Sequence, residues 1–153
     1  MKIDPYFRPI LISTLIVILL NTVFLLPING APLFTYFLGG VIAVMLFKRE
    51  LKDEFQEITA WDSAILGLGS GALVGAILTL IISLKLQDLD MQKFVIDTIN
   101  ESMKMHSTME FEALENLGPG FYMIIAITTI LVCCFMSLFG SLATIPFVNK
   151  AKK

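Results

Sequence analysis

Charged residues are absent from three long stretches of the sequence, at residues 10–47, 63–84 and 116–149. A helix that crosses a membrane needs about 20 predominantly apolar residues, because it must span a hydrocarbon core about 30 Å thick. The second and third stretches therefore each predict one membrane-spanning helix, at residues 63–86 and 120–147.

The first uncharged stretch is too long for one crossing and carries turn chemistry at its centre. Two prolines and an Asn-Gly pair stand together there, in the run Pro27-Ile28-Asn29-Gly30-Ala31-Pro32. These residue types favour a tight turn. We therefore expect two helices, at residues 9–26 and 33–47, with a re-entrant hairpin as the alternative. The whole pattern predicts an all-α integral membrane bundle of four transmembrane helices.

A polar segment at residues 48–62 separates the second and third predicted spans. Leu51, Phe55 and Ile58 recur there at helical spacing, which predicts a short amphipathic helix. We expect this helix on the inner membrane surface, with docking of a cytoplasmic partner as the alternative. Trp61 stands where an interfacial aromatic anchor is expected.

The segment at residues 87–119 predicts a helical extracytoplasmic loop. Its first helix carries an apolar stripe made of Met91, Phe94, Val95, Ile99 and Met103. A second helix should start at the capping box Ser107-Thr108-Met109-Glu110 and end before Gly118 and Pro119. Helices this short cannot bury their apolar sides alone, so they should pack on the bundle, the membrane surface or another protein. The stripe is our candidate partner-binding surface.

Composition agrees with a membrane protein. Hydrophobic residues make up 56% of the 153 residues, and charged residues make up 16%. An ordinary soluble domain has about 25% charged residues. This balance excludes a soluble enzyme, a nucleic-acid-binding protein and a disulfide scaffold.

The basic residues predict the orientation of the chain. Eight of the 11 Lys and Arg residues lie near the two ends of the chain and in residues 48–62, and three lie in residues 85–104. Lys and Arg accumulate in the cytoplasmic segments of membrane proteins. Both termini should therefore face the cytoplasm. The loop at 87–119, which carries 7 acidic residues, should be extracytoplasmic.

Small residues predict close packing between the spans. Gly67, Gly71 and Gly75 recur every four residues in the third span, with Ser63 on the same face. Small residues let helix backbones approach closely in lipid. The opposing faces should come from Gly39 and Gly40 of the second span or Gly140 of the fourth. Spacing leaves open whether this contact forms within the chain or between subunits.

Candidate chemistry is sparse. The interiors of the predicted spans contain no ionisable side chain of the Asp, Glu, Lys, Arg or His type, which argues against ion-coupled transport. The soft side chains of Met103, Met105, His106 and Met109 suit Cu(I). However, helical spacing places Met103 and Met105 on different sides, and methionine is a common packing residue. We therefore expect no metal site, no cofactor and no catalytic residue.

Two segments carry a resemblance to a family. Residues 39–49, which run from a Gly-Gly pair to Lys48 and Arg49, precede a second Gly- and Ala-rich segment at residues 70–75. With the polar loop and the fourth span, this arrangement resembles a group of uncharacterised small four-span bacterial membrane proteins. The resemblance implies an architecture and a bacterial inner-membrane location. It implies no activity and no functional residues.

These observations lead to an expected function. We expect a structural or accessory subunit of a larger membrane protein complex, which binds through its transmembrane faces and its acidic outer loop. The alternative is a small homo-oligomeric channel or carrier for a neutral or apolar solute. The expected partners are the lipid bilayer and other membrane protein subunits. We expect neither enzymatic activity nor binding to nucleic acid.

Overall fold

The computed structural model describes residues 5–23, 31–51, 57–106 and 118–150, and these residues are helical with short connections. They form five helices: α1 (Phe7–Val23), α2 (Ala31–Glu50), α3 (Ala60–Lys85), α4 (Leu89–His106) and α5 (Pro119–Lys150). No strand occurs in these ranges. The predicted all-α class is confirmed. The second loop helix, expected after Ser107, lies outside the described residues.

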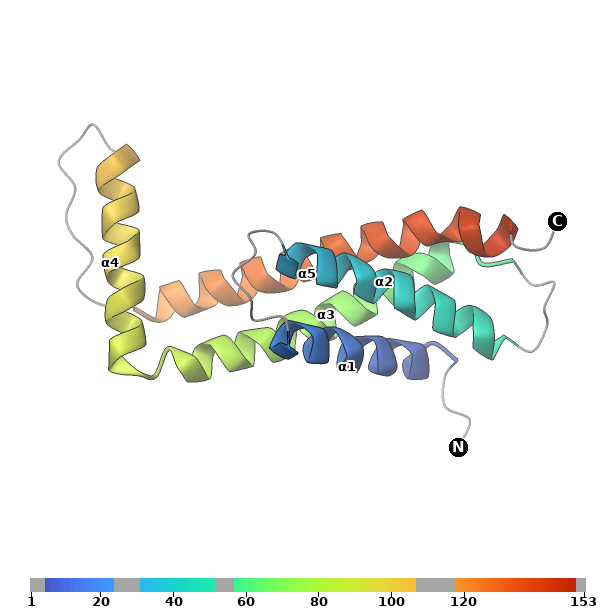
Figure 1. Ribbon diagram of the computed structural model, residues 1–153, viewed down its shortest axis with the longest axis horizontal. Helices are drawn as coiled ribbons and strands as arrows, with labels where there is room; N and C mark the ends of the chain where they lie inside the picture. Colours follow the sequence, from blue (N-terminus) through green and yellow to red (C-terminus); the bar gives the residue numbers. More distant parts are fainter. Residues whose placement is uncertain (1–4, 24–30, 52–56, 107–117, 151–153) are drawn as a thin grey trace.

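Four of the helices form an elongated bundle, and the fifth stands across one end of it (Figure 1). In the bundle, α1 and α3 run in one direction and α2 and α5 in the other (Figure 1). The largest interface joins α3 and α5, followed by that between α2 and α5. The start of α1, the end of α2, the start of α3 and the end of α5 meet at one end, the N/C end. Helix α4 marks the opposite end, the α4 end.

Two helices, α3 and α5, are long and apolar enough to cross a membrane by length and composition, with 26 and 32 residues. The described part of α1 is a shorter apolar helix, and α2 ends in the charged residues Lys48, Arg49 and Glu50. The sequence predicts four membrane-crossing helices, whereas helix length and apolar composition support two of them. The described part of α1 has 17 residues, and three of the 20 residues of α2 are charged.

The interior of the bundle mixes apolar and small polar side chains, and many large apolar side chains lie outside. Along α1, Phe7, Leu11, Leu15 and Leu19 form one exposed row at helical spacing. A second exposed row follows α5 and consists of Ile124, Ile127, Leu131, Phe135, Phe139 and Leu142. The buried polar side chains are Ser13, Thr14, Thr35, Ser63, Ser70, Ser137, Ser141 and Thr144. Rows of large apolar side chains on the outside are informative, because single exposed apolar residues are common whereas long continuous rows are not.

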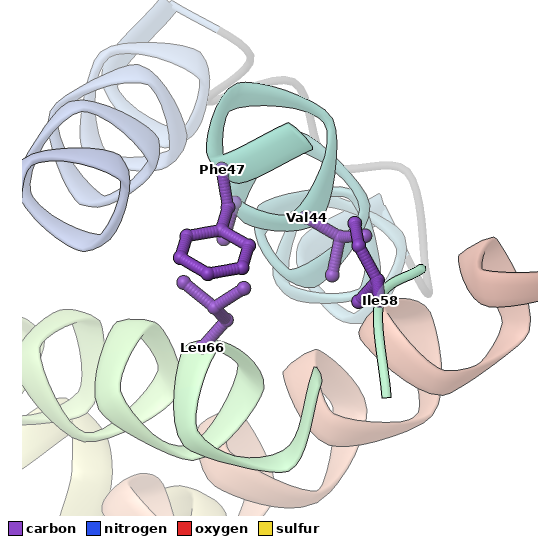
Figure 2. Close-up of a cluster of buried hydrophobic side chains, with 5 residues drawn as sticks. Val44, Phe47, Ile58 and Leu66 are labelled. Carbon is purple, nitrogen blue, oxygen red and sulfur yellow. The ribbon is translucent and has the colours of Figure 1, made fainter. Parts of the chain in front are cut away.

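An apolar cluster closes the N/C end of the bundle. Phe47 and Val44 of α2 pack with Leu66 of α3 and with Ile58 of the connection before α3 (Figure 2). Figure 2 shows the ring of Phe47 directed at Leu66, while Ile58 lies beside Val44. The connection between α2 and α3 therefore contributes to the core.

The centre of the amphipathic helix predicted for residues 48–62 lies outside the described residues, because these end at 51 and resume at 57. Helix α2 continues to Glu50, residues 57–59 are not helical, and α3 begins at Ala60. The reason is local: Thr59 and Asp62 form a capping box that starts α3. Ile58 is 2% exposed and belongs to the core, so its apolar character does not mark a surface helix.

Candidate functional site

The predicted glycine face of α3 packs against α5. A Cβ built on Gly71 would lie 2.6 Å from Cα of Cys134, and one built on Gly75 would lie 2.7 Å from Cα of Ile130. One on Gly67 would lie 2.8 Å from Cα of Leu138. Real Cβ atoms essentially never come this close to a backbone atom. The two helix backbones are therefore in direct contact along this line.

Helix α2 makes a similar contact with the same α5 segment, around Ser137 and Ser141. A Cβ on Gly40 would lie 2.7 Å from the backbone nitrogen of Ser141 and would also overlap the carbonyl oxygen of Ser137. A Cβ on Gly140 would overlap the carbonyl oxygen of Phe37. Gly39 instead faces the side chain of Val17 in α1, at 2.8 Å. The structure thus places the glycines of α2, α3 and α5 at contacts within one chain.

Hydroxyl groups line the same interface. The Ser70 and Ser137 hydroxyl oxygens lie 2.7 Å apart and join α3 to α5. Thr144 donates to the carbonyl oxygen of Gly140 in its own helix at 2.7 Å. Ser63 is fully buried at the start of the predicted face, and its hydroxyl oxygen has no hydrogen-bond partner among the described residues. These contacts make the centre of the bundle a packed core, in which hydroxyls are accommodated by helix carbonyls.

Asn21, near the end of α1, joins this helix to α2. The Thr35 hydroxyl donates to Oδ1 of Asn21 at 3.2 Å, and the Asn21 amide donates to the carbonyl oxygen of Val17 at 2.9 Å. The most polar side chain of the first uncharged stretch therefore bridges two helices.

Residues of α2, α3 and α5, and of the chain just before α1 and just before α3, hold the N/C end together, and we name this set the clasp. The rings of Tyr6 and Phe47 stack with centroids 4.8 Å apart. The Tyr6 hydroxyl donates to Oδ1 of Asp62 at 2.6 Å. The Asn149 side chain accepts from the backbone nitrogen of Ile58 at 3.2 Å and donates to its carbonyl oxygen at 3.1 Å.

Sequence reasoning missed the clasp. One signal was available, because Thr59 and Asp62 have the spacing of a capping box. The contacts that join Tyr6 to Asp62 and Ile58 to Asn149 connect residues 56 and 91 positions apart. No local pattern predicts such pairs.

Asp62 stands one residue before the uncharged stretch 63–84 and is the ionised member of the clasp. Its partial burial raises the pKa, but hydrogen bonds from Tyr6 and from the Thr59 hydroxyl and backbone N–H stabilise the carboxylate. The net result is a pKa below the ordinary value. Because the folded state binds its proton less tightly than the unfolded state, Asp62 stabilises the fold above the unfolded pKa of about 4. This contribution is lost as the pH falls through the folded pKa.

We expect Asp62→Asn to lower the free energy of unfolding at pH 7 by about 1 kcal/mol, because the charge is lost and the single amide oxygen cannot accept from both Tyr6 and Thr59. The variant should also show a smaller stability difference between pH 7 and pH 3 than the wild type. Thermal unfolding in detergent, followed by circular dichroism, measures both. Glu57→Gln removes an exposed charge nearby and serves as the control. Equal effects of the two substitutions would contradict a role for the clasp.

The candidate partner-binding stripe lies on α4, outside the bundle. Met91 and Val95 face an apolar recess of about 190 Å³ that they share with Ile82, Leu86 and Ile125, together with Lys85. Phe94 is 67% exposed, and Ile99 is half-buried. The side chain of Met103 lies outside the described residues. The charged residues of α4 lie on a neighbouring face, which Phe94 borders: Asp90, Lys93, Asp97, Glu101 and Lys104.

The potential metal ligands and thiols are placed as follows. The side chains of Met103, Met105 and His106 and the whole of Met109 lie outside the described residues, so the copper hypothesis is not tested. Within the described ranges, no group of three or more His, Cys, Asp or Glu side chains could hold a metal ion. Cys133 and Cys134 are free thiols, and Cys133 packs with Val17 and Val74.

Comparisons with known proteins add no family to this description. No protein-family model matches the chain, and neither a curated protein nor a solved structure is significantly similar to it.

Proposed function

We propose that the chain is an integral membrane protein whose bundle helices α1, α2, α3 and α5 all cross the bilayer. The exposed apolar rows of α1 and α5 support this proposal, because lipid would cover them and water would not. The interior supports it as well, since small and hydroxyl-bearing residues are the usual contacts between membrane helices. The described part of α1 has 17 residues, which is at the lower limit of about 17–25 for a spanning helix.

The proposed orientation places the N/C end in the cytoplasm and α4 on the extracytoplasmic surface. Among the described charges, the N/C end carries Arg8, Lys48, Arg49 and Lys150 against three acidic residues, Glu50, Glu57 and Asp62. The α4 end carries Asp88, Asp90, Asp97 and Glu101 against three lysines. This asymmetry favours a cytoplasmic N/C end. The resemblance to small bacterial four-span proteins favours a bacterial inner membrane.

The proposed function is that of an accessory subunit in a larger membrane protein complex. The observation that carries it is α4, an amphipathic helix that stands outside the bundle and makes no extensive contact with another described helix (Figure 1). Leu89 and Phe94 are 72% and 67% exposed on it. A partner subunit would cover this surface. It would also cover part of the apolar rows of α1 and α5, and lipid would cover the rest.

The test is the native mass of the particle after mild solubilisation, with all co-purifying chains identified. We expect a stoichiometric complex with at least one other membrane protein. Phe94→Gln should release the partner, because it puts a polar group at the exposed apolar surface without touching the bundle. The control Lys93→Gln changes the adjacent residue, which lies on the charged side of α4.

A lone chain would contradict the accessory role. A homo-oligomer would do the same and would favour the alternative, a channel or carrier for a neutral or apolar solute. Solute flux into liposomes that contain the purified chain would then be the next measurement.

A further inference from the structure

A groove lies between α1 and α2 at the N/C end of the bundle. It has a volume of about 400 Å³ and is lined by Arg8, Ile12, Leu46, Arg49 and Glu50. Residues from the first turn of α1 and the last turn of α2 meet here because these two helices run in opposite directions (Figure 1). Two guanidinium groups and one carboxylate therefore share one recess.

The lining of the groove changes in polarity along the helix axes. Arg8, Arg49 and Glu50 lie at the outer edge, where the charged segments of the chain begin. Ile12 is one helical turn further along α1 from Arg8, and Leu46 is about one turn before Arg49 in α2. Both apolar residues therefore lie deeper in the bundle, where uncharged sequence continues. The groove therefore has a charged outer part, its mouth, formed by Arg8, Arg49 and Glu50, and an apolar inner part, its floor, formed by Ile12 and Leu46.

The charges at the mouth favour an anion. Arg8 Nε lies 3.5 Å from a carboxylate oxygen of Glu50, and the Arg8 side chain remains 71% exposed. An exposed ion pair of this kind is worth little by itself, but it holds the guanidinium of Arg8 at the groove. With Arg49, the mouth has two positive charges and one negative charge. Arginine is well suited to phosphate, because its planar guanidinium donates two parallel hydrogen bonds.

From this geometry we propose that the groove binds the phosphate group of a glycerophospholipid from the surrounding leaflet. Arg8 and Arg49 hold the phosphate, and the upper part of an acyl chain lies on Ile12 and Leu46. Basic recesses between transmembrane helices are suited to lipid headgroups on the cytoplasmic side. The inference rests on the membrane location under the proposed function, and it does not depend on a partner complex.

A free phosphate compound could bind the same arginines, but it has no acyl chain to contact the apolar floor. The two sources can therefore be separated by measuring lipid retention in the presence and absence of inorganic phosphate. Diacylglycerol, which has the acyl chains without the phosphate, tests whether the acyl chains alone are enough for retention.

The experiment is native mass spectrometry of the purified full chain in detergent, with phosphatidylglycerol added. We expect the wild-type chain to retain one phosphatidylglycerol molecule and little diacylglycerol, and we expect millimolar inorganic phosphate not to displace the lipid. The double variant Arg8→Gln/Arg49→Gln should reduce retention by about tenfold or more, because it removes both charged donors. Both residues are exposed, so the variant should fold.

The control variant Lys150→Gln/Lys152→Gln removes the same number of positive charges and should retain the lipid. Equal losses in the two variants would show general attraction to anionic lipid and overturn the site. Unchanged retention in the arginine variant, or displacement of the lipid by inorganic phosphate, would also overturn it. Flotation of the wild-type chain with phosphatidylcholine vesicles checks the membrane location separately. A chain that stays in solution refutes both ideas, whereas a chain that floats but fails the retention test refutes the lipid site alone.

Discussion

Gly40→Ala is expected to lower the free energy of unfolding by about 3 kcal/mol, at the upper end of the usual range for overpacking. The new Cβ would overlap the carbonyl oxygen of Ser137 and lie 2.7 Å from the backbone nitrogen of Ser141. Both atoms belong to the backbone of α5, so no change of side-chain rotamer relieves the collision. Helices α2 and α5 would have to separate, and the packing of α5 on α3 would be disturbed with them.

Thermal and denaturant unfolding in detergent measures this effect. Gly120→Ala is the matched control, because Gly120 lies in the first turn of α5 and a Cβ there meets nothing within 4 Å. The control should unfold like the wild type or slightly later, since alanine favours a helix more than glycine does. If Gly40→Ala and Gly120→Ala unfold at the same temperature and denaturant concentration, the close contact between α2 and α5 is refuted.

Gly71→Leu should have an even larger effect and prevent the bundle from assembling. A Cβ at this position already lies 2.6 Å from the carbonyl oxygen of Cys133 and from Cα of Cys134. The rest of a leucine side chain has no space between α3 and α5. We expect a loss of more than about 3 kcal/mol, seen as protease sensitivity and an early unfolding transition.

Ala72→Leu inserts the same side chain at the next position of α3, where the residue is exposed on the outside of the bundle. This control should remain folded. Gly69→Ala gives a finer comparison, because a Cβ there meets only the end of the Ile10 side chain, which can move aside. If Gly71→Leu and Ala72→Leu behave alike, α3 and α5 do not pack through the glycine face.

Much of the secondary structure could be predicted from local signals. The helices α1, α2, α3 and α5 follow uncharged stretches, and α5 begins at Pro119, one residue before the predicted span. Proline suits the first turn of a helix because the missing N–H has no partner there in any case. The segment at residues 48–62 was predicted less well. Its apolar spacing resembled a surface helix, whereas Ile58 is a core residue held by Asn149.

Spacing alone established which residues of α3 share a small face, because the helical repeat places Gly67, Gly71 and Gly75 on one side. It did not establish what that face contacts, since the sequence contains several small-residue faces of similar character. Only the folded chain shows that α5 packs on both α2 and α3, with backbone contacts at Gly40 and at Gly71. The clasp, the position of α4 across the end of the bundle and the groove at Arg8 and Arg49 also became visible only in three dimensions. Helix formation depends on neighbours a few residues apart, whereas helix pairing depends on the fit of surfaces far apart in the chain, which no local pattern contains.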